Sequence, residues 1–291
     1  MKKLSIVAAI LMLLAVVCVM LAVTPSYHER WDIRKAGEYY SGHHGYDFQL
    51  PVSSVDQKVW TYWQKTGFSV FTKGKEDFFE AEIPQLDCTE PLSEAVFKFL
   101  QEEIRSLARK TRDENLNNLN LLNAYYSKSL VHDSTIIRTY QKGLCTSEVV
   151  SLKGYWCFYP DGASHEGIGI SGRNFVLNGS ALQEIELQDL FDESSGGDWF
   201  AVLAKEVEAD LRRQGYSDLE LEEDLPFEQF DDFLIVEEGL KIIFQNYAFY
   251  SGIHGFPVAY VSWDLLAPFL KPGAPVTCWY EKQLQKQRQD G

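Results

Sequence analysis

The sequence lacks the residue spacings that build most known metal and catalytic sites. Only 5 of its 291 residues are cysteines, and no two have C-x-x-C spacing, so neither a zinc site nor a redox dithiol is predicted. There is no G-x-S-x-G motif, the nucleophile elbow of a large hydrolase class. The acidic stretch 218–224 lacks the D-x-D-x-D-G spacing of a calcium loop, and we interpret it as a solvated loop. The sequence therefore predicts no metal and no cofactor.

Basic residues are also scarce. The chain has 27 Lys and Arg residues against 42 Asp and Glu residues, a net charge of −15. Between Glu184 and Glu238, 19 acidic residues stand against 3 basic ones. An acidic surface repels nucleic acid and anionic lipid, and it speeds the encounter with a basic partner. We expect no nucleic-acid partner. We interpret the charge first as an aid to solubility outside the cell, with attraction of a basic partner as the alternative.

One long apolar run occurs, at the N-terminus. It extends from Leu4 to Val23 and follows Lys2 and Lys3. About 20 apolar residues suffice to cross a bilayer, and flanking lysines stay in the cytoplasm. We predict a membrane anchor in residues 1–23, with the rest of the chain periplasmic or extracellular. A cleaved signal peptide with a weak site near residue 24 and a lipoprotein through Cys18 are the alternatives.

Four cysteines lie outside this leader: Cys88, Cys145, Cys157 and Cys278. An oxidising compartment would permit one or two disulfides among them. Small buried thiols are the alternative, and the sequence leaves the pairing open.

Periodic segments alternate between strand and helix. In the N-terminal half, residues 78–86 alternate as a strand that Pro84 limits to an edge or an end. A long helix should follow Thr89, a plausible N-cap, and should weaken or end at the asparagine-rich stretch 115–123. Its buried stripe has a period of 3.6 residues and comprises Leu92, Val96, Phe97, Leu100, Ile104 and Leu107.

Hairpins dominate the C-terminal half. Strands are expected at residues 147–159, at 174–177 and 181–187 around Asn178-Gly179, at 233–236 and 240–244, and at 258–261. Asp198 should cap a second helix that Gly215 ends, and Ser262 a short one. The predicted class is α+β, with a mainly antiparallel sheet, a long helix from the N-terminal half and a second helix from the C-terminal half.

The stretch GIGISG, residues 167–172, has the G-x-G-x-x-G spacing of a dinucleotide-binding loop. Such a loop needs a helix N-terminus after it, whereas a strand and a hairpin follow here. We therefore expect its glycines to let neighbouring backbone pass close by. The preceding His165 and Glu166 support an alternative hypothesis, an envelope-polymer hydrolase with His165 and a nearby carboxylate in the site.

The segment YWCFYPDGASHEGIGISGRNFVLNGSALQEIELQDLF, residues 155–191, resembles a domain-of-unknown-function family. This family occurs in the extracytoplasmic part of RsiV-type anti-sigma factors and PdaC-type peptidoglycan deacetylases. The resemblance covers residues 145–271, and residues 65–144 are less closely similar to the companion domain that precedes it. We therefore divide the chain into a leader (1–23), a spacer (24–64), a companion α+β subdomain (65–144), the family domain (145–272) and a tail (273–291).

The resemblance implies a non-catalytic binding or sensing module of the bacterial cell envelope. In RsiV-type proteins the domain resembles a receptor for lysozyme, a basic enzyme. The sigma-binding and deacetylase activities reside outside the shared domain and do not carry over. We expect a basic protein such as lysozyme, or an envelope glycan such as a peptidoglycan fragment, as the ligand. The candidate binding residues are His165, Glu222, Glu223, Asp224, Glu228, Asp231 and Asp232.

Overall fold

The computed structural model describes residues 27–35, 56–68, 76–87, 89–125, 133–160, 167–195, 197–216, 227–245 and 256–290. The expected leader lies outside these ranges. So do four of the candidate binding residues, His165, Glu222, Glu223 and Asp224. In the described part of the chain, no helix is both long and apolar enough to cross a membrane.

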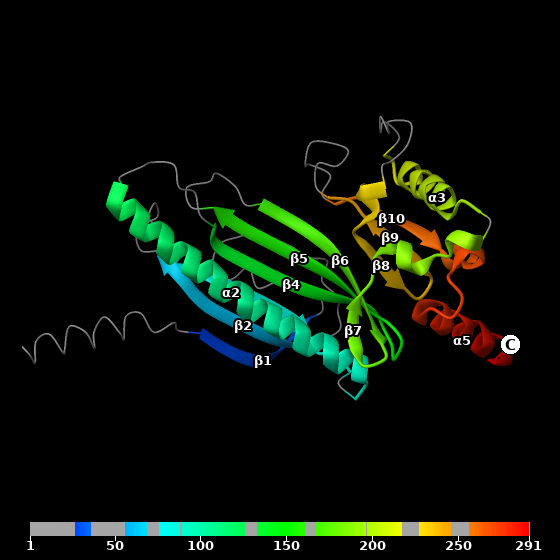
Figure 1. Ribbon diagram of the computed structural model, residues 1–291, viewed down its shortest axis with the longest axis horizontal. Helices are drawn as coiled ribbons and strands as arrows, with labels where there is room; N and C mark the ends of the chain where they lie inside the picture. The colour runs from blue at the N-terminus through cyan, green and yellow to red at the C-terminus, as the bar shows by residue number, and fades with distance from the viewer. Residues whose placement is uncertain are drawn as a thin grey trace, which may run out of the picture.

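A seven-stranded sheet forms the larger layer of the fold (Figure 1). In spatial order its strands are β1 (Tyr27–Lys35), β2 (Asp56–Phe68), β3 (Glu76–Pro84), β4 (Asp133–Cys145), β5 (Val150–Pro160), β6 (Gly167–Asn178) and β7 (Ala181–Glu184). Neighbouring strands are antiparallel except β3 and β4, which are parallel. A parallel pair needs a long crossover connection, and here it contains a helix.

That helix, α2 (Pro91–Tyr125), packs along one face of the sheet (Figure 1). The predicted apolar stripe is its buried side, with Leu92, Val96, Leu100 and Ile104 at most 1% exposed. The asparagine-rich stretch 115–123 does not interrupt the helix, and α2 ends shortly after it, at Tyr125. Asparagine costs only about 0.7 kcal/mol per helical residue, which an established helix can absorb.

A smaller sheet lies against the opposite face. Its order is β10 (Val258–Ser262), β9 (Gly239–Ile243) and β8 (Phe233–Val236), all antiparallel. Along β8 the side chains alternate: Leu234 packs towards the seven-stranded sheet, whereas Phe233 and Ile235 join the core beneath a second helix, α3 (Trp199–Arg213). The small sheet therefore lies between the large sheet and α3.

Several short helices complete the C-terminal half. They are the 3-10 turns η2 (Leu187–Leu190), η3 (Glu193–Ser195), η4 (Phe227–Phe230) and η6 (Ala267–Phe269), and the helix α4 (Trp263–Leu266). The last element is α5 (Pro275–Asp290), which the sequence analysis did not predict. It extends beyond α4 beside the small sheet (Figure 1).

The α+β class is confirmed, as are several local predictions. Asp198 caps α3 by accepting a hydrogen bond of 2.9 Å from the Ala201 N–H. Gly215, after the helix, has φ +94°, and Gly179 in the β6–β7 turn has φ +62°. Both values lie in the left-handed region that glycine adopts without steric cost.

The expected domain division differs from the arrangement of the strands. β1 and most of β2 lie in residues 24–64, for which a spacer was expected. The division at residues 144 and 145 falls at the end of β4, and strands from both sides of it pair in the same sheet.

The glycine-rich stretch forms the first half of β6. A Cβ at position 169 would lie 2.0 Å from the Trp156 ring, and one at 172 would lie 2.0 Å from the Phe233 carbonyl oxygen. Gly169 therefore leaves room for an aromatic side chain of β5, and Gly172 leaves room for the backbone of β8. This strand placement agrees with the sequence argument against a nucleotide loop.

Candidate functional site

Three of the seven candidate binding residues are described: Glu228, Asp231 and Asp232. Glu228 lies in η4, and the two aspartates connect η4 to β8. Glu228 and Asp231 are exposed to solvent, whereas Asp232 is only partly exposed. The structure thus places three acidic residues along one short segment, and their role in binding stays a prediction.

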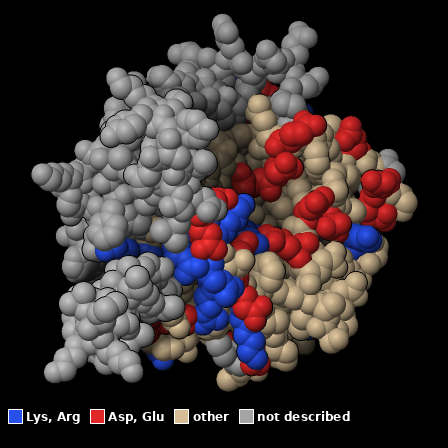
Figure 2. All heavy atoms as spheres, turned by 60° about the vertical axis from the view of Figure 1, so that its left-hand side comes forward, with Lys and Arg blue, Asp and Glu red and all other residues tan. Residues whose placement is uncertain are grey.

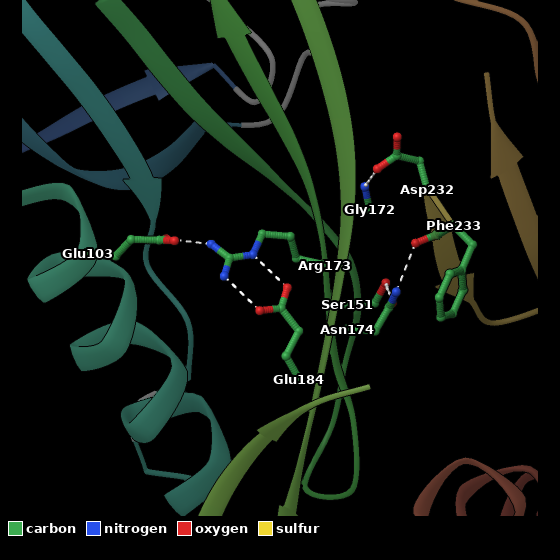
Figure 3. A network of polar contacts seen from close by, with 8 residues as sticks. All are labelled: Glu103, Ser151, Gly172, Arg173, Asn174, Glu184, Asp232 and Phe233. Carbon is green, nitrogen blue, oxygen red and sulfur yellow. Dashed lines mark hydrogen bonds and ion pairs between the residues drawn. The ribbon is translucent and has the colours of Figure 1, made fainter. Parts of the chain in front are cut away.

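Asp232 ties the small sheet to the glycine-rich strand. Its Oδ1 accepts a hydrogen bond of 3.2 Å from the Gly172 N–H (Figure 3), and its Oδ2 accepts one of 2.6 Å from Gln245 Nε2. Gln245 Nε2 also donates to the Ile170 carbonyl oxygen at 2.5 Å. Burial raises the pKa of Asp232 despite these hydrogen bonds, and the nearby charge of Asp231 raises it further. Asp232 therefore has structural partners of its own.

A buried polar chain continues this contact between the sheets (Figure 3). Ser151 donates a hydrogen bond of 2.6 Å to Asn174 Oδ1 and accepts one of 3.0 Å from the Ile235 N–H. Asn174 Nδ2 donates to the Phe233 carbonyl oxygen at 2.9 Å. Ser151 and Asn174 are at most 1% exposed. Buried polar groups are costly unless they are paired, so these bonds fix how β8 lies on β5 and β6.

Arg173 points to the other face of β6, towards α2 (Figure 3). Its Nε and Nη2 bind the two carboxylate oxygens of Glu184 at 2.7 and 2.8 Å, and its Nη1 binds Glu103 of α2 at 2.5 Å. The guanidinium also lies 5.5 Å from the Phe99 ring centre and 5.3 Å from that of Phe175. A planar fork suits both the bidentate carboxylate and the aromatic faces, so Arg173 links α2, β6 and the end of β7.

These contacts give the residues 172–174 structural roles. Gly172 and Asn174 face the small sheet, and Arg173 faces the helix, as the strand period of two requires. The polar groups of Gly172, Arg173 and Asn174 in these contacts all have protein partners. A ligand site must therefore be sought elsewhere among the described residues.

A pocket of about 420 Å³ lies between the β8–β9 turn, the start of α4 and one side of α5. Three carboxylates line it: Glu237, Glu238 and Asp264. Four aromatic residues line it too: Tyr260, Trp263, Trp279 and Tyr280. The amides of Gln283 and Gln287 come from successive turns of α5. The pocket thus combines acidic, aromatic and amide groups.

Hydrogen bonds hold the walls of this pocket in place. The Tyr260 hydroxyl donates to the Glu238 carbonyl oxygen at 2.7 Å, and the backbone N–H of Trp263 donates to the same oxygen at 3.1 Å. The indole Nε1 of Trp263 donates to the Val236 carbonyl oxygen at 3.0 Å. The β8–β9 turn is therefore fixed against β10 and α4 before any ligand arrives.

The pocket carboxylates have no basic partner among the described residues. The acidic residues of α3 pair with Arg212 and Arg213, whereas no pocket carboxylate forms an ion pair with a described residue. Burial raises the pKa of Tyr280, as do the charge and the hydrogen bond of Asp264. The described residues that line the pocket include no lysine or arginine. Its electrostatic potential is therefore negative.

Charges are also segregated on the face that Figure 2 shows. Figure 2 shows acidic side chains gathered over one part of the viewed face, with lysines and arginines forming a narrower band beside them. Such segregation orients a charged partner during encounter.

Sequence reasoning did not identify the pocket. It predicted strands at 233–236 and 240–244, with Glu237 and Glu238 between them, and a tail at residues 273–291. The signal that it passed over was the spacing of Tyr280, Gln283, Leu284 and Gln287, which places four residues on one side of a helix.

No described residues form an evident catalytic or metal site. Among them, no group of three or more His, Cys, Asp or Glu residues could hold a metal ion. Cys145, Cys157 and Cys278 carry thiols rather than disulfides, and Cys88 lies outside the described residues. Burial raises the pKa of the Cys145 thiol to about 11. This cysteine is therefore protonated at neutral pH and a poor nucleophile.

Comparisons with known proteins agree with part of the resemblance. Two solved structures are similar in fold, each with 9% identity and a TM-score of 0.47. One is a DUF3298 family protein from Pseudomonas aeruginosa PAO1, where the match covers 85% of this chain and 94% of that one. The other is a DUF3298 family member from Bacteroides fragilis NCTC 9343, with 89% and 98% covered. No curated protein matches this chain. Residues 188–264 match the family model "Protein of unknown function (DUF3298)".

Proposed function

We propose that this protein is a membrane-anchored extracytoplasmic binding or sensing protein of the bacterial cell envelope, and that its ligand is a basic protein, with lysozyme as the first candidate. The observation that carries the proposal is the pocket in which Glu237, Glu238 and Asp264 have no basic partner among the described residues. Charges left unpaired at a concave site favour a ligand of opposite sign.

The overall charge supports the same ligand class. A net charge of −15 attracts a cationic protein at long range and raises its association rate at low salt. Nucleic acid and anionic lipid would be repelled by the same charge.

The anchored location rests on the sequence. The apolar run from Leu4 to Val23 is long enough for a membrane helix, and Lys2 and Lys3 favour a cytoplasmic start. The resemblance to the extracytoplasmic part of RsiV-type and PdaC-type proteins supports the same location and a receptor role.

Calorimetry with the full chain in detergent micelles tests the proposal. We expect lysozyme to bind at about 20 mM salt and to bind more weakly at about 150 mM, because salt screens charges beyond a Debye length. Cytochrome c, a second small basic protein, serves as the control for unspecific attraction. No lysozyme binding at low salt, or equal binding of both proteins, would overturn the lysozyme assignment.

An envelope glycan is the competing ligand. A peptidoglycan fragment that binds with little salt dependence, in the absence of lysozyme binding, would replace the basic protein as the ligand class. The hydrolase hypothesis depends on His165, which lies outside the described residues, and no feature of the described residues favours it.

A further inference from the structure

The pocket beside α5 has the composition of a cation-binding cage. Carboxylates attract a positive charge, and the partly exposed rings of Tyr260 and Tyr280 add cation–π attraction. Trp263 has its ring centre 6.1 Å from that of Trp279 and 6.0 Å from that of Tyr280, so the aromatic residues form one connected wall.

We propose that this pocket binds the guanidinium group of an arginine side chain on the basic partner. The inference rests on the proposed function and deepens it, because it identifies which ligand group enters which site. Glu237, Glu238 and Asp264 line the pocket, so their carboxylates would pair with the guanidinium. The aromatic wall lies beside them.

The negative charge of the pocket lining favours a cationic ligand over a neutral one. The described lining residues contribute three carboxylates and no basic group. Glu237, Glu238 and Asp264 are exposed to solvent, so a cation gains direct attraction to them when it enters the pocket, whereas a neutral ligand gains none.

The low exposure of the tryptophan rings argues against a site on which a sugar ring stacks. A pyranose stacks on an open aromatic face, but Trp263 and Trp279 are each only 2% exposed. Tyr260 and Tyr280 are partly exposed, at the sides of the pocket. These smaller faces suit a flat guanidinium better than a sugar ring.

Size and shape favour arginine over lysine. A pocket of about 420 Å³ is much larger than an ammonium group needs. A guanidinium presents five N–H donors in one plane, so it can bond to several acceptors at once and stack on a ring. The side-chain oxygens of Gln283 and Gln287 add acceptors to those of the carboxylates.

The rigidity of the site favours binding by a single side chain. The turn that carries Glu237 and Glu238 is held by Tyr260 and Trp263, as described above. A site that is fixed in advance loses little conformational entropy when a ligand enters.

Saturation-transfer NMR on the full chain in micelles tests the inference. The probe is N-acetyl-arginine amide, and the matched control is N-acetyl-citrulline amide, which has a similar shape without the charge. We expect saturable binding of the arginine probe only. The double variant Glu237→Gln/Glu238→Gln should weaken that binding about tenfold, the equivalent of two lost partly exposed charge pairs.

Two further variants make the result specific. Glu102→Gln/Glu193→Gln removes the same charge from exposed positions outside the pocket and should change the probe affinity less than about twofold. Asp264→Asn tests the third carboxylate independently, and a weakening of about threefold is expected.

Three outcomes would overturn the inference. They are equal binding of the arginine and citrulline probes, equal or tighter binding of N-acetyl-lysine amide, and binding of a chito-oligosaccharide that Glu237→Gln/Glu238→Gln abolishes. Lysozyme separates this inference from the proposed function. If lysozyme binds the wild type and the double variant equally, the basic-protein receptor stands and the arginine pocket falls. If the arginine probe binds and lysozyme does not, the lysozyme assignment falls and the pocket stands.

Discussion

Gly172 and Asp232 are joined by a hydrogen bond of 3.2 Å between residues 60 positions apart in the sequence. The bond connects β6 of the large sheet with the entry to β8 of the small one. It forms because position 172 has no side chain: a Cβ there would lie 2.0 Å from the Phe233 carbonyl oxygen. The glycine-rich stretch thus serves the packing of two sheets.

Gly172→Ala should destabilise the protein strongly. The added Cβ meets backbone atoms that cannot rotate away, so we expect a loss of about 3 kcal/mol in the free energy of unfolding. Gly179→Ala is the matched control, because nothing lies within 4 Å of its Cβ position and only φ of +62° opposes alanine. That strain costs about 1 kcal/mol. Urea denaturation measures both, and equal losses would contradict the close sheet contact.

Asn174→Ala should lower the free energy of unfolding by about 2–3 kcal/mol, because it removes the donor to the buried Phe233 carbonyl and the acceptor of the buried Ser151 O–H. Ser151→Ala and the double variant complete a thermodynamic cycle. The two losses should be less than additive, since Ser151 donates to Asn174. Strict additivity would show that the two side chains act independently.

Arg173→Lys keeps the charge and removes the planar fork. A lysine ammonium cannot bind Glu184 in two places while it reaches Glu103, so we expect a loss of about 1–2 kcal/mol. Arg109→Lys, at an exposed position on α2, is the control and should change stability by less than about 0.5 kcal/mol. Thermal denaturation compares the variants, and similar values for both would rule out a bidentate role for Arg173.

Asp232 should give an unusual pH dependence. Its pKa in the folded protein is raised above the ordinary value of 3.8, chiefly by burial. The folded state therefore holds this proton more tightly than the unfolded state does, and stability from this group is lost as the pH rises through the folded pKa. Asp232→Asn removes the titration and can still accept the Gly172 hydrogen bond. Its free energy of unfolding relative to wild type should rise from about pH 3 to about pH 7, and a flat or falling difference would contradict the raised pKa.

Local signals allowed much of the C-terminal half to be predicted from sequence. The Asn178-Gly179 turn and the Asp198 cap each depend on residues within a few positions, so tertiary contacts were not needed to recognise them. The stripe of α2 was visible for the same reason, because its period repeats over several turns.

The strands that were missed have patterns that depend on distant partners. β4 is buried between α2 and the small sheet, so its side chains alternate between two covered faces and the polar–apolar contrast is weak. Tyr140 packs towards the helix and Ile137 towards the small sheet, and both are at most 5% exposed. No local alternation distinguishes such a strand.

The pocket could not be predicted from the sequence because residues from three separate segments line it. Glu238 lies in a turn, Tyr260 in β10 and Tyr280 in α5. Their meeting depends on the packing of α5 beside the small sheet. The acidic composition predicted a basic ligand, but the structure was needed to find carboxylates without a basic partner in a pocket.

The central claim is that a basic protein binds through the carboxylates of the pocket. Its most direct test is the dissociation constant of lysozyme for the full chain at about 20 mM salt, measured for wild type, Glu237→Gln/Glu238→Gln and the charge-matched Glu102→Gln/Glu193→Gln. We predict that only the pocket variant weakens binding, by about tenfold. Equal affinity of both variants, or no binding by the wild type, would contradict the claim.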